Sequence, residues 1–201
     1  MSARRKRETG ATMVEFAIIL PIFVALLFGI IELGLAFYNR TVVDDATQAG
    51  GRVGAAVGND IDVDLFVLET IGSEVDQLPN GGVGIVKFVE IFEVNAAGNP
   101  TSELNFYEYT YTPDPTQCDW SPCPQGSTPA NYNGWTWRPD ERSVKVGDLD
   151  TIGVKVYFAH NWITGVIPGG DRDCTRALRT STCWIEETSL RLEPLQFDVG
   201  N

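Results

Sequence analysis

Residues 11–38, ATMVEFAIILPIFVALLFGIIELGLAFY, decide the fold of this chain. From Phe16 to Ile31 every residue is apolar, proline or glycine, and after Glu32 the apolar run resumes as far as Tyr38. A bilayer core of about 30 Å is crossed by roughly 20 helical residues, which rise about 1.5 Å each. The stretch therefore predicts a transmembrane helix over residues 11–38.

The charges on either side of this run predict its orientation. Residues 4–7 are all basic, whereas Arg40 is the first basic residue after the run. Because basic flanks stay in the cytoplasm, we expect a single-pass protein of the cytoplasmic membrane, with residues 1–10 inside and residues 39–201 forming an extracytoplasmic domain. A cleaved secretory signal is the competing interpretation, but its apolar region is usually only about 7 to 15 residues long.

Two glutamates interrupt the apolar run. A charge at the centre of a membrane span costs about 2.5–3.5 kcal/mol on insertion scales, and less near an edge, so such residues tend to be functional. Glu15 lies near the start of the run and Glu32 near its end. Either carboxylate can instead be exposed to lipid headgroups, and for Glu32 we assign no role beyond that of a membrane acid.

The start of the run resembles a known processing signal. Gly10 is followed by Ala11, and Glu15 and Phe16 are the fifth and sixth residues after that glycine. This arrangement is similar to the type IV prepilin site, which a prepilin peptidase cuts after the glycine. Together with DDATQAGGRVGA at residues 44–55, it resembles the TadE-like minor pilins, or pseudopilins, of the Tad (Flp) pilus system.

The resemblance implies a set of roles and partners. It implies removal of residues 1–10, so that Ala11 becomes the new N-terminus. It also implies that Glu15 and Phe16 serve assembly, with the carboxylate pairing with the α-amine of a neighbouring subunit. The implied partners are other pilin or pseudopilin subunits, the prepilin peptidase and the proteins of the assembly platform.

Beyond the membrane the sequence predicts an α+β domain with an antiparallel sheet. Small residues recur every three or four positions from Val43 and predict a helix that ends by Gly58. A second helix is indicated by an apolar stripe through Leu68, Ile71, Val75 and Leu78. Alternating β-branched and aromatic residues predict strands at 83–94, 106–112, 151–158 and 184–197, the first two forming a hairpin. The long N-terminal helix is expected to pack on this sheet.

Three alternating aspartates, Asp60, Asp62 and Asp64, raise the question of a calcium site. An EF-hand loop starting at Asp60 requires glycine at its sixth position and glutamate at its twelfth, where this chain has Leu65 and Ile71. We therefore favour an aspartate that caps the second helix, and expect no metal.

The segment 112–141 is too long and too rich in proline and aromatic residues for a plain connection. Trp120, Tyr132, Trp135 and Trp137 can either stack on sugars or pin an irregular loop to the sheet. The first possibility gives an alternative function, an anchored or secreted adhesin-like module that contacts a glycan or a surface. We favour the second.

The chain has four cysteines, all after the predicted span. An even number on the oxidising side of a membrane predicts disulfides, with three possible connectivities. We favour the pairs that are close in sequence, Cys118–Cys123 and Cys174–Cys183. A zinc site of four cysteines is the rival interpretation, although the spacing does not match that of zinc modules.

Composition argues against several other functions. The formal net charge is −12, so no basic surface for nucleic acid is expected. The single histidine, His160, lies at a predicted strand end, and no catalytic or nucleotide-binding motif surrounds it. We expect neither enzymatic activity nor a cofactor.

Overall fold

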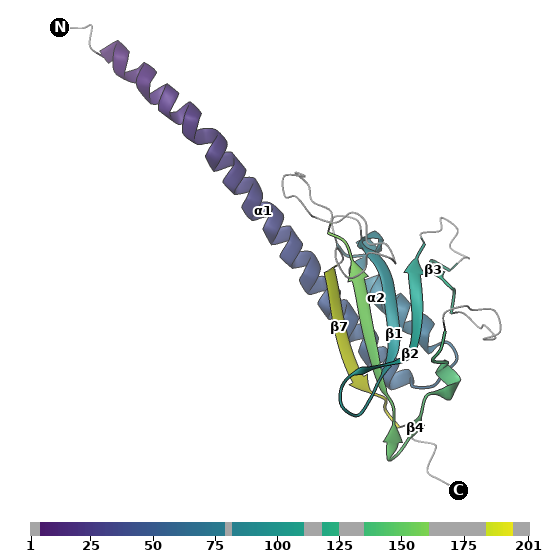
Figure 1. Ribbon diagram of the computed structural model, residues 1–201. Coiled ribbons are helices and arrows are strands. Elements are labelled where there is room, and N and C mark those ends of the chain that lie inside the picture. Colours follow the sequence, from purple (N-terminus) through teal and green to yellow (C-terminus); the bar gives the residue numbers. More distant parts are fainter. Residues whose placement is uncertain (1–4, 79–81, 111–117, 125–134, 161–183, 195–201) are drawn as a thin grey trace.

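The computed structural model describes residues 5–78, 82–110, 118–124, 135–160 and 184–194, with side chains from Thr12 onwards. A single helix, α1 (Arg5–Val57), runs from the N-terminal end into the head of the molecule. Its length is roughly 80 Å at about 1.5 Å per residue. Figure 1 shows the first part of α1 protruding from a head that consists of its last turns and the other described elements. The predicted boundary at residue 39 therefore falls inside one continuous helix.

The head contains a second helix beside the last turns of α1. This helix, α2 (Val63–Val75), buries Leu68, Ile71 and Val75, which confirms the predicted apolar stripe. Between the two helices the chain turns at Gly58, whose φ of +74° is a left-handed conformation that favours glycine. The predicted end of the first helix is thereby confirmed.

The sheet of the head has five antiparallel strands in the order β3-β2-β1-β6-β7. Its strands are β1 (Val86–Val94), β2 (Pro100–Tyr109), β3 (Trp120–Ser121), β6 (Thr151–Phe158) and β7 (Trp184–Arg191). A separate small hairpin consists of β4 (Val144–Lys145) and β5 (Asp148–Leu149), and short 3₁₀ helices, η1 (Gly82–Ile85) and η3 (Pro139–Glu141), complete the described elements. The predicted α+β class and the hairpin of β1 and β2 are confirmed.

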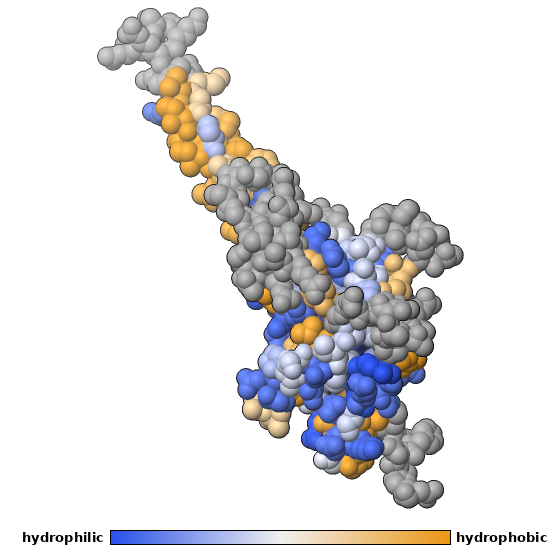
Figure 2. Space-filling model, turned by 45° about the vertical axis from the view of Figure 1, so that its right-hand side comes forward, coloured by the Kyte–Doolittle hydropathy of each residue, from blue (hydrophilic) through white to orange (hydrophobic). Residues whose placement is uncertain are grey.

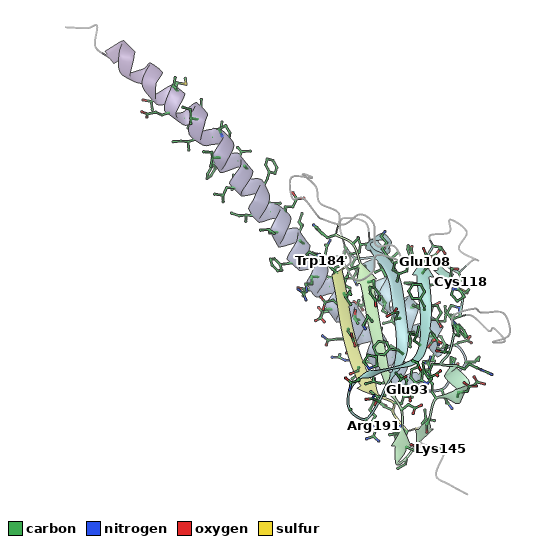
Figure 3. All side chains as sticks on the ribbon, in the orientation of Figure 1. Glu93, Glu108, Cys118, Lys145, Trp184 and Arg191 are labelled. Atoms are coloured by element: carbon green, nitrogen blue, oxygen red, sulfur yellow. A yellow bond between two sulfur atoms is a disulfide. The ribbon has the colours of Figure 1, made fainter. Side chains whose placement is uncertain are left out.

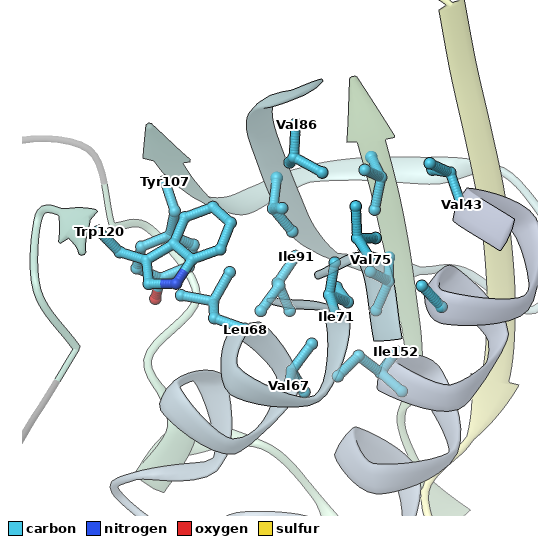
Figure 4. Close-up of a cluster of buried hydrophobic side chains, with 14 of the residues drawn as sticks. Val43, Val67, Leu68, Ile71, Val75, Val86, Ile91, Tyr107, Trp120 and Ile152 are labelled. Carbon is cyan, nitrogen blue, oxygen red and sulfur yellow. The ribbon is translucent and has the colours of Figure 1, made fainter. Parts of the chain in front are cut away.

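The hydrophobic core lies between the two helices and one face of this sheet (Figure 4). Alternate residues of β6 point into it, and all four side chains predicted to face inward, Ile152, Val154, Val156 and Phe158, are fully buried. Figure 4 shows side chains of α2 directed toward the strands, with Tyr107 and Trp120 closing one end of the cluster.

Glycines let α1 approach the sheet closely. A Cβ atom on Gly54 would lie 2.7 Å from Cδ1 of Ile152, and one on Gly51 would lie 2.7 Å from Cγ2 of Thr188. A real Cβ atom needs more room than that, so either substitution requires a neighbouring side chain to move. The small residues therefore hold the head on the helix, as their spacing predicts.

Candidate functional site

The protruding part of α1 exposes an almost entirely apolar surface (Figure 2). Its large apolar side chains are exposed from Met13 to Ile31, a rise of about 27 Å along the helix. This is the one helix in the described part of the chain that is long and apolar enough to cross a membrane. The length agrees with the predicted span.

The residues of the predicted processing and assembly site lie at the far end of this helix. The backbone of Gly10 and Ala11 is helical, and the side chains of Glu15 and Phe16 are exposed. Glu15 is separated from Glu32 by roughly 25 Å of helical rise, so it lies well away from the head. Its carboxylate is open to a partner outside this chain.

Glu32, by contrast, is buried. Glu32, Ala36 and Asn39 are spaced four and three residues apart, so they lie on one face of α1. Their exposed fractions are 3%, 1% and 1%. The structure therefore places Glu32 at the junction of helix and head. Its side chain is buried, which argues against the interpretation that Glu32 is exposed to lipid headgroups.

The junction is closed by a histidine from the end of the sheet. Asn39 Nδ2 lies 2.9 Å from His160 Nδ1, and the His160 ring stacks on Trp184 with ring centroids 6.1 Å apart. Because an amide nitrogen only donates, this arrangement requires Nδ1 to accept and the imidazole to carry its proton on Nε2. Burial lowers the pKa of His160, and the nearby Glu32 carboxylate opposes that shift. At neutral pH the ring is therefore uncharged and serves as a hydrogen-bond acceptor.

A second polar group lies inside the head, where α2 meets β2. The carboxylate of Asp64 accepts hydrogen bonds from Asn105 Nδ2 at 2.7 Å and from the Tyr107 hydroxyl at 2.6 Å. Its other oxygen lies 2.7 Å from Nη2 of Arg142, and both side chains of this ion pair are fully buried. Burial, followed by the charge of Asp64, raises the pKa of Tyr107 well above its usual value. The Tyr107 hydroxyl therefore remains a donor.

These contacts decide the interpretation of the three aspartates. Asp64 is committed to Arg142, and among the described residues no cluster of histidine, cysteine and acidic side chains could hold a metal ion. Asp62 occupies the N-cap position of α2, but its side chain makes no capping hydrogen bond. Asp60 Oδ1 instead accepts a hydrogen bond from the backbone N–H of Asp62 at 2.9 Å. An aspartate therefore occupies the predicted N-cap position, but the capping hydrogen bond from its side chain is not formed.

The aromatic residues of segment 112–141 pack against the head. Trp120 and Trp137 are only 6% and 5% exposed. Trp120 contacts Tyr109 edge to face, and the Trp137 ring lies 4.2 Å below the Arg142 guanidinium carbon. These two indole faces are not available to a sugar, which favours the interpretation that they pin the loop. Tyr132 lies outside the described residues.

The same loop carries the first predicted disulfide. Cys118 and Cys123 are bonded, with their Cα atoms 5.8 Å apart, which confirms this pair. The bond also excludes a zinc site that uses all four cysteines as thiolates. Cys174 and Cys183 lie outside the described residues, so their pairing stays a prediction.

Sequence reasoning missed the two buried polar groups. One signal was available for the junction, because Glu32, Ala36, Asn39 and Val43 continue the helical stripe that holds the head. The pairing of Asp64 with Arg142 joins residues far apart in the sequence, and no local pattern announces it.

Within the described residues, these features define one candidate membrane-spanning helix that carries an α+β head. Residues 10–52 match the family model of TadE-like proteins. The N-terminal segment of this chain is thus TadE-like, and the resemblance inferred from its motifs is confirmed. The match covers the protruding helix and the first turns of the part of α1 that holds the head. No curated protein and no solved structure matches the chain.

Proposed function

We propose that this chain is a minor pilin or pseudopilin that takes part in assembly of a Tad (Flp) pilus and is cut by a prepilin peptidase after Gly10. The observation that carries the proposal is the TadE-like match over residues 10–52, which lies on an apolar helix that protrudes from the head. The proposed role is structural and involves neither catalysis nor a cofactor. Its partners are other pilin subunits, the peptidase and the assembly platform.

The proposed location is the cytoplasmic membrane, with the head on the extracytoplasmic side. The basic residues at positions 4–7 support this orientation, since such residues are retained in the cytoplasm. The disulfide between Cys118 and Cys123 also supports it, because disulfides persist in oxidising compartments.

The difference between the two glutamates supports a role for Glu15 in assembly. Glu32 is buried within its own chain, whereas Glu15 is exposed on the apolar helix. After cleavage, the α-amine of Ala11 would be largely cationic at neutral pH, since its reference pKa is about 8. Moving a carboxylate and an ammonium group into an apolar environment as a pair costs less free energy than moving the two charges there separately. Glu15 therefore suits an ion pair with the amine of a neighbouring subunit.

The experiment that tests this function is N-terminal sequencing of the mature protein, alone and with Gly10→Val. The wild-type chain should begin at Ala11, and the variant should retain residues 1–10 because the peptidase requires a small residue before the cut. Gly34→Val is the matched control, since Gly34 lies on the same helix and a Cβ atom added there would meet nothing within 4 Å. Processing of Gly10→Val at the wild-type level would contradict the proposal.

A further inference from the structure

We infer that the end of the head farthest from the protruding part of α1 holds a binding site for a sugar that carries a carboxylate, that is, a uronic acid. In this site the Arg191 guanidinium binds the ligand's carboxylate, and Glu93 and Asp150 accept hydrogen bonds from its hydroxyls. The inference goes beyond the proposed function, because neither processing nor assembly requires a ligand.

The site is a pocket of about 500 Å³ between three segments of the chain. Its walls are the end of β1 with the turn that follows it, residues 149–151, and the end of β7. Figure 3 shows Glu93 and Arg191 at the end of the head opposite to the protruding part of α1. Pockets that bind small molecules typically enclose about 300–1,000 Å³, so this one has room for a sugar.

Hydrogen-bond donors gather on the wall formed by β6 and β7. Thr151 and Arg191 are direct partners in the pairing of these strands, and Ser189 precedes Arg191 by two residues. All three side chains therefore lie on the same face of the sheet. Within the part of the chain that the structure describes, nothing bonds to the Arg191 guanidinium or to the two hydroxyls. A free guanidinium next to hydroxyl groups suits a carboxylate, which it binds through two parallel charge-assisted hydrogen bonds.

Hydrogen-bond acceptors line the other two walls. Glu93 Oε2 accepts a hydrogen bond from the Thr101 hydroxyl at 2.9 Å. Asp150 Oδ2 accepts one from the backbone N–H of Ser143 at 2.7 Å. Each carboxylate is thus held in place through one oxygen. Because an ionised carboxylate has two accepting oxygens, the second oxygen of each is available to a donor on a ligand.

The turn after β1 is a preorganised part of the pocket. Asn95 Oδ1 accepts hydrogen bonds from the backbone N–H groups of Ala97 at 2.9 Å and Asn99 at 3.1 Å. Gly98 adopts a φ of +82°, a left-handed conformation that favours glycine. A wall that is already ordered loses little conformational freedom when a ligand binds.

The mixture of charges selects the class of ligand. Glu93 and Asp150 outnumber Arg191, so a small inorganic anion is repelled by the pocket as a whole. A uronic acid places its single carboxylate at Arg191 and presents ring hydroxyls to both acidic walls. An amino acid offers an ammonium group at only one point. No aromatic ring is among the described residues that line the pocket, so hydrogen bonds hold the sugar in place of stacking.

The test is an NMR titration of the full chain in detergent micelles with D-galacturonate and D-glucuronate. D-galactose and D-glucose are the matched neutral ligands, since they differ from the acids only at the carboxylate. Inorganic phosphate and 4-aminobutyrate, which has a carboxylate and an ammonium group but no hydroxyl, represent the other two ligand classes. The variants are Arg191→Gln and, as a control, Lys145→Gln. Lys145 is an exposed cation at the same end of the head, as Figure 3 shows, but it does not line the pocket.

We expect at least one of the two acids to bind about tenfold more tightly than its neutral counterpart, because hydrogen bonds to charged groups are the stronger ones. Arg191→Gln should abolish this preference, and Lys145→Gln should preserve it. Absence of binding by either acid, equal binding of the neutral sugars, or an unchanged preference in Arg191→Gln would overturn the inference. Equally tight binding of phosphate or 4-aminobutyrate would also overturn it and would assign the pocket to another ligand class. N-terminal sequencing of the same preparations tests the proposed function separately.

Discussion

The buried ion pair of the head provides the sharpest test of the packing described above. In Arg142→Met the side chain keeps a similar length but loses its charge, and Asp64 retains its hydrogen bonds from Asn105 and Tyr107 without a counter-charge. Removing one partner of a fully buried pair costs about 3–5 kcal/mol. Because a domain is typically stable by only about 5–15 kcal/mol, the substitution should remove a large part of the free energy of unfolding.

The chain offers a matched control four residues earlier. Arg138 lies 2.6 Å from Asp140, as close as the buried pair, but the two side chains are 38% and 47% exposed. Exposed ion pairs contribute only about 0–1 kcal/mol, since water and salt screen them. Arg138→Met should therefore leave stability almost unchanged.

The assay is urea unfolding of the full chain in detergent micelles, followed by tryptophan fluorescence. Trp137 lies against Arg142, so it reports on this part of the head. Adding Asp64→Asn to Arg142→Met should recover part of the lost stability, because the unpaired charge is then removed. A loss below about 1 kcal/mol for Arg142→Met, equal to that of Arg138→Met, would refute the reasoning from burial.

Three further predictions concern the helix, the disulfide and the junction. Glu15→Ala should still be inserted and processed but should enter sheared filaments at a level lower by orders of magnitude, because an unpaired amine in an apolar environment costs about 3–5 kcal/mol; filament entry equal to wild type, with Glu15→Asp as the geometric control, would count against the ion pair. Peptide mapping without reduction should recover Cys118 and Cys123 in one linked fragment, and replacing both by serine should lower stability by about 2 kcal/mol in the chain-entropy model; free thiols at these positions would contradict the structure. The pKa of His160 is lowered on folding, so the unfolded chain binds more protons than the folded one. The stability that the buried neutral ring contributes is therefore fully present above the unfolded pKa of about 6.5, and it is lost as the pH falls toward the lower folded pKa. Stability measured from pH 7 to pH 5 should therefore fall less in His160→Gln than in wild type, unless Glu32 fully compensates the lowered pKa, in which case the two slopes coincide and the prediction is wrong.

The sequence predicts the parts of this fold that depend on local patterns. Three patterns each lie within one element: the apolar run, the spacing of small residues before Gly58 and the alternation in β6. Because such patterns are local, the helical or extended form of these segments and their buried faces are predictable. The predicted start of β1 is less accurate. The predicted strand begins at residue 83, but residues 82–85 form η1, where Gly82 adopts a φ of +51°.

The contacts that join distant segments could not be predicted in this way. Asp64 precedes the first strand and Arg142 follows the third, and only the folded chain places them 2.7 Å apart. Glu32 looks like a membrane acid when the run is considered alone, because hydropathy does not say which face of a helix a head will cover. The family motif around Gly10 and Glu15, in contrast, is local in the sequence, so it indicates a function without any knowledge of the head.

The unbroken course of α1 has a mechanical consequence. A helix that continues from Arg5 to Val57 fixes the direction in which the head faces relative to every side chain of the protruding part of α1. At about 100° per residue, the 17 steps from Glu15 to Glu32 place the Glu15 side chain roughly 100° around the helix axis from the face that holds the head. Any neighbour that binds Glu15 thereby also fixes the direction in which the sheet faces. A rotation of the helix in the membrane turns the head outside it by the same angle.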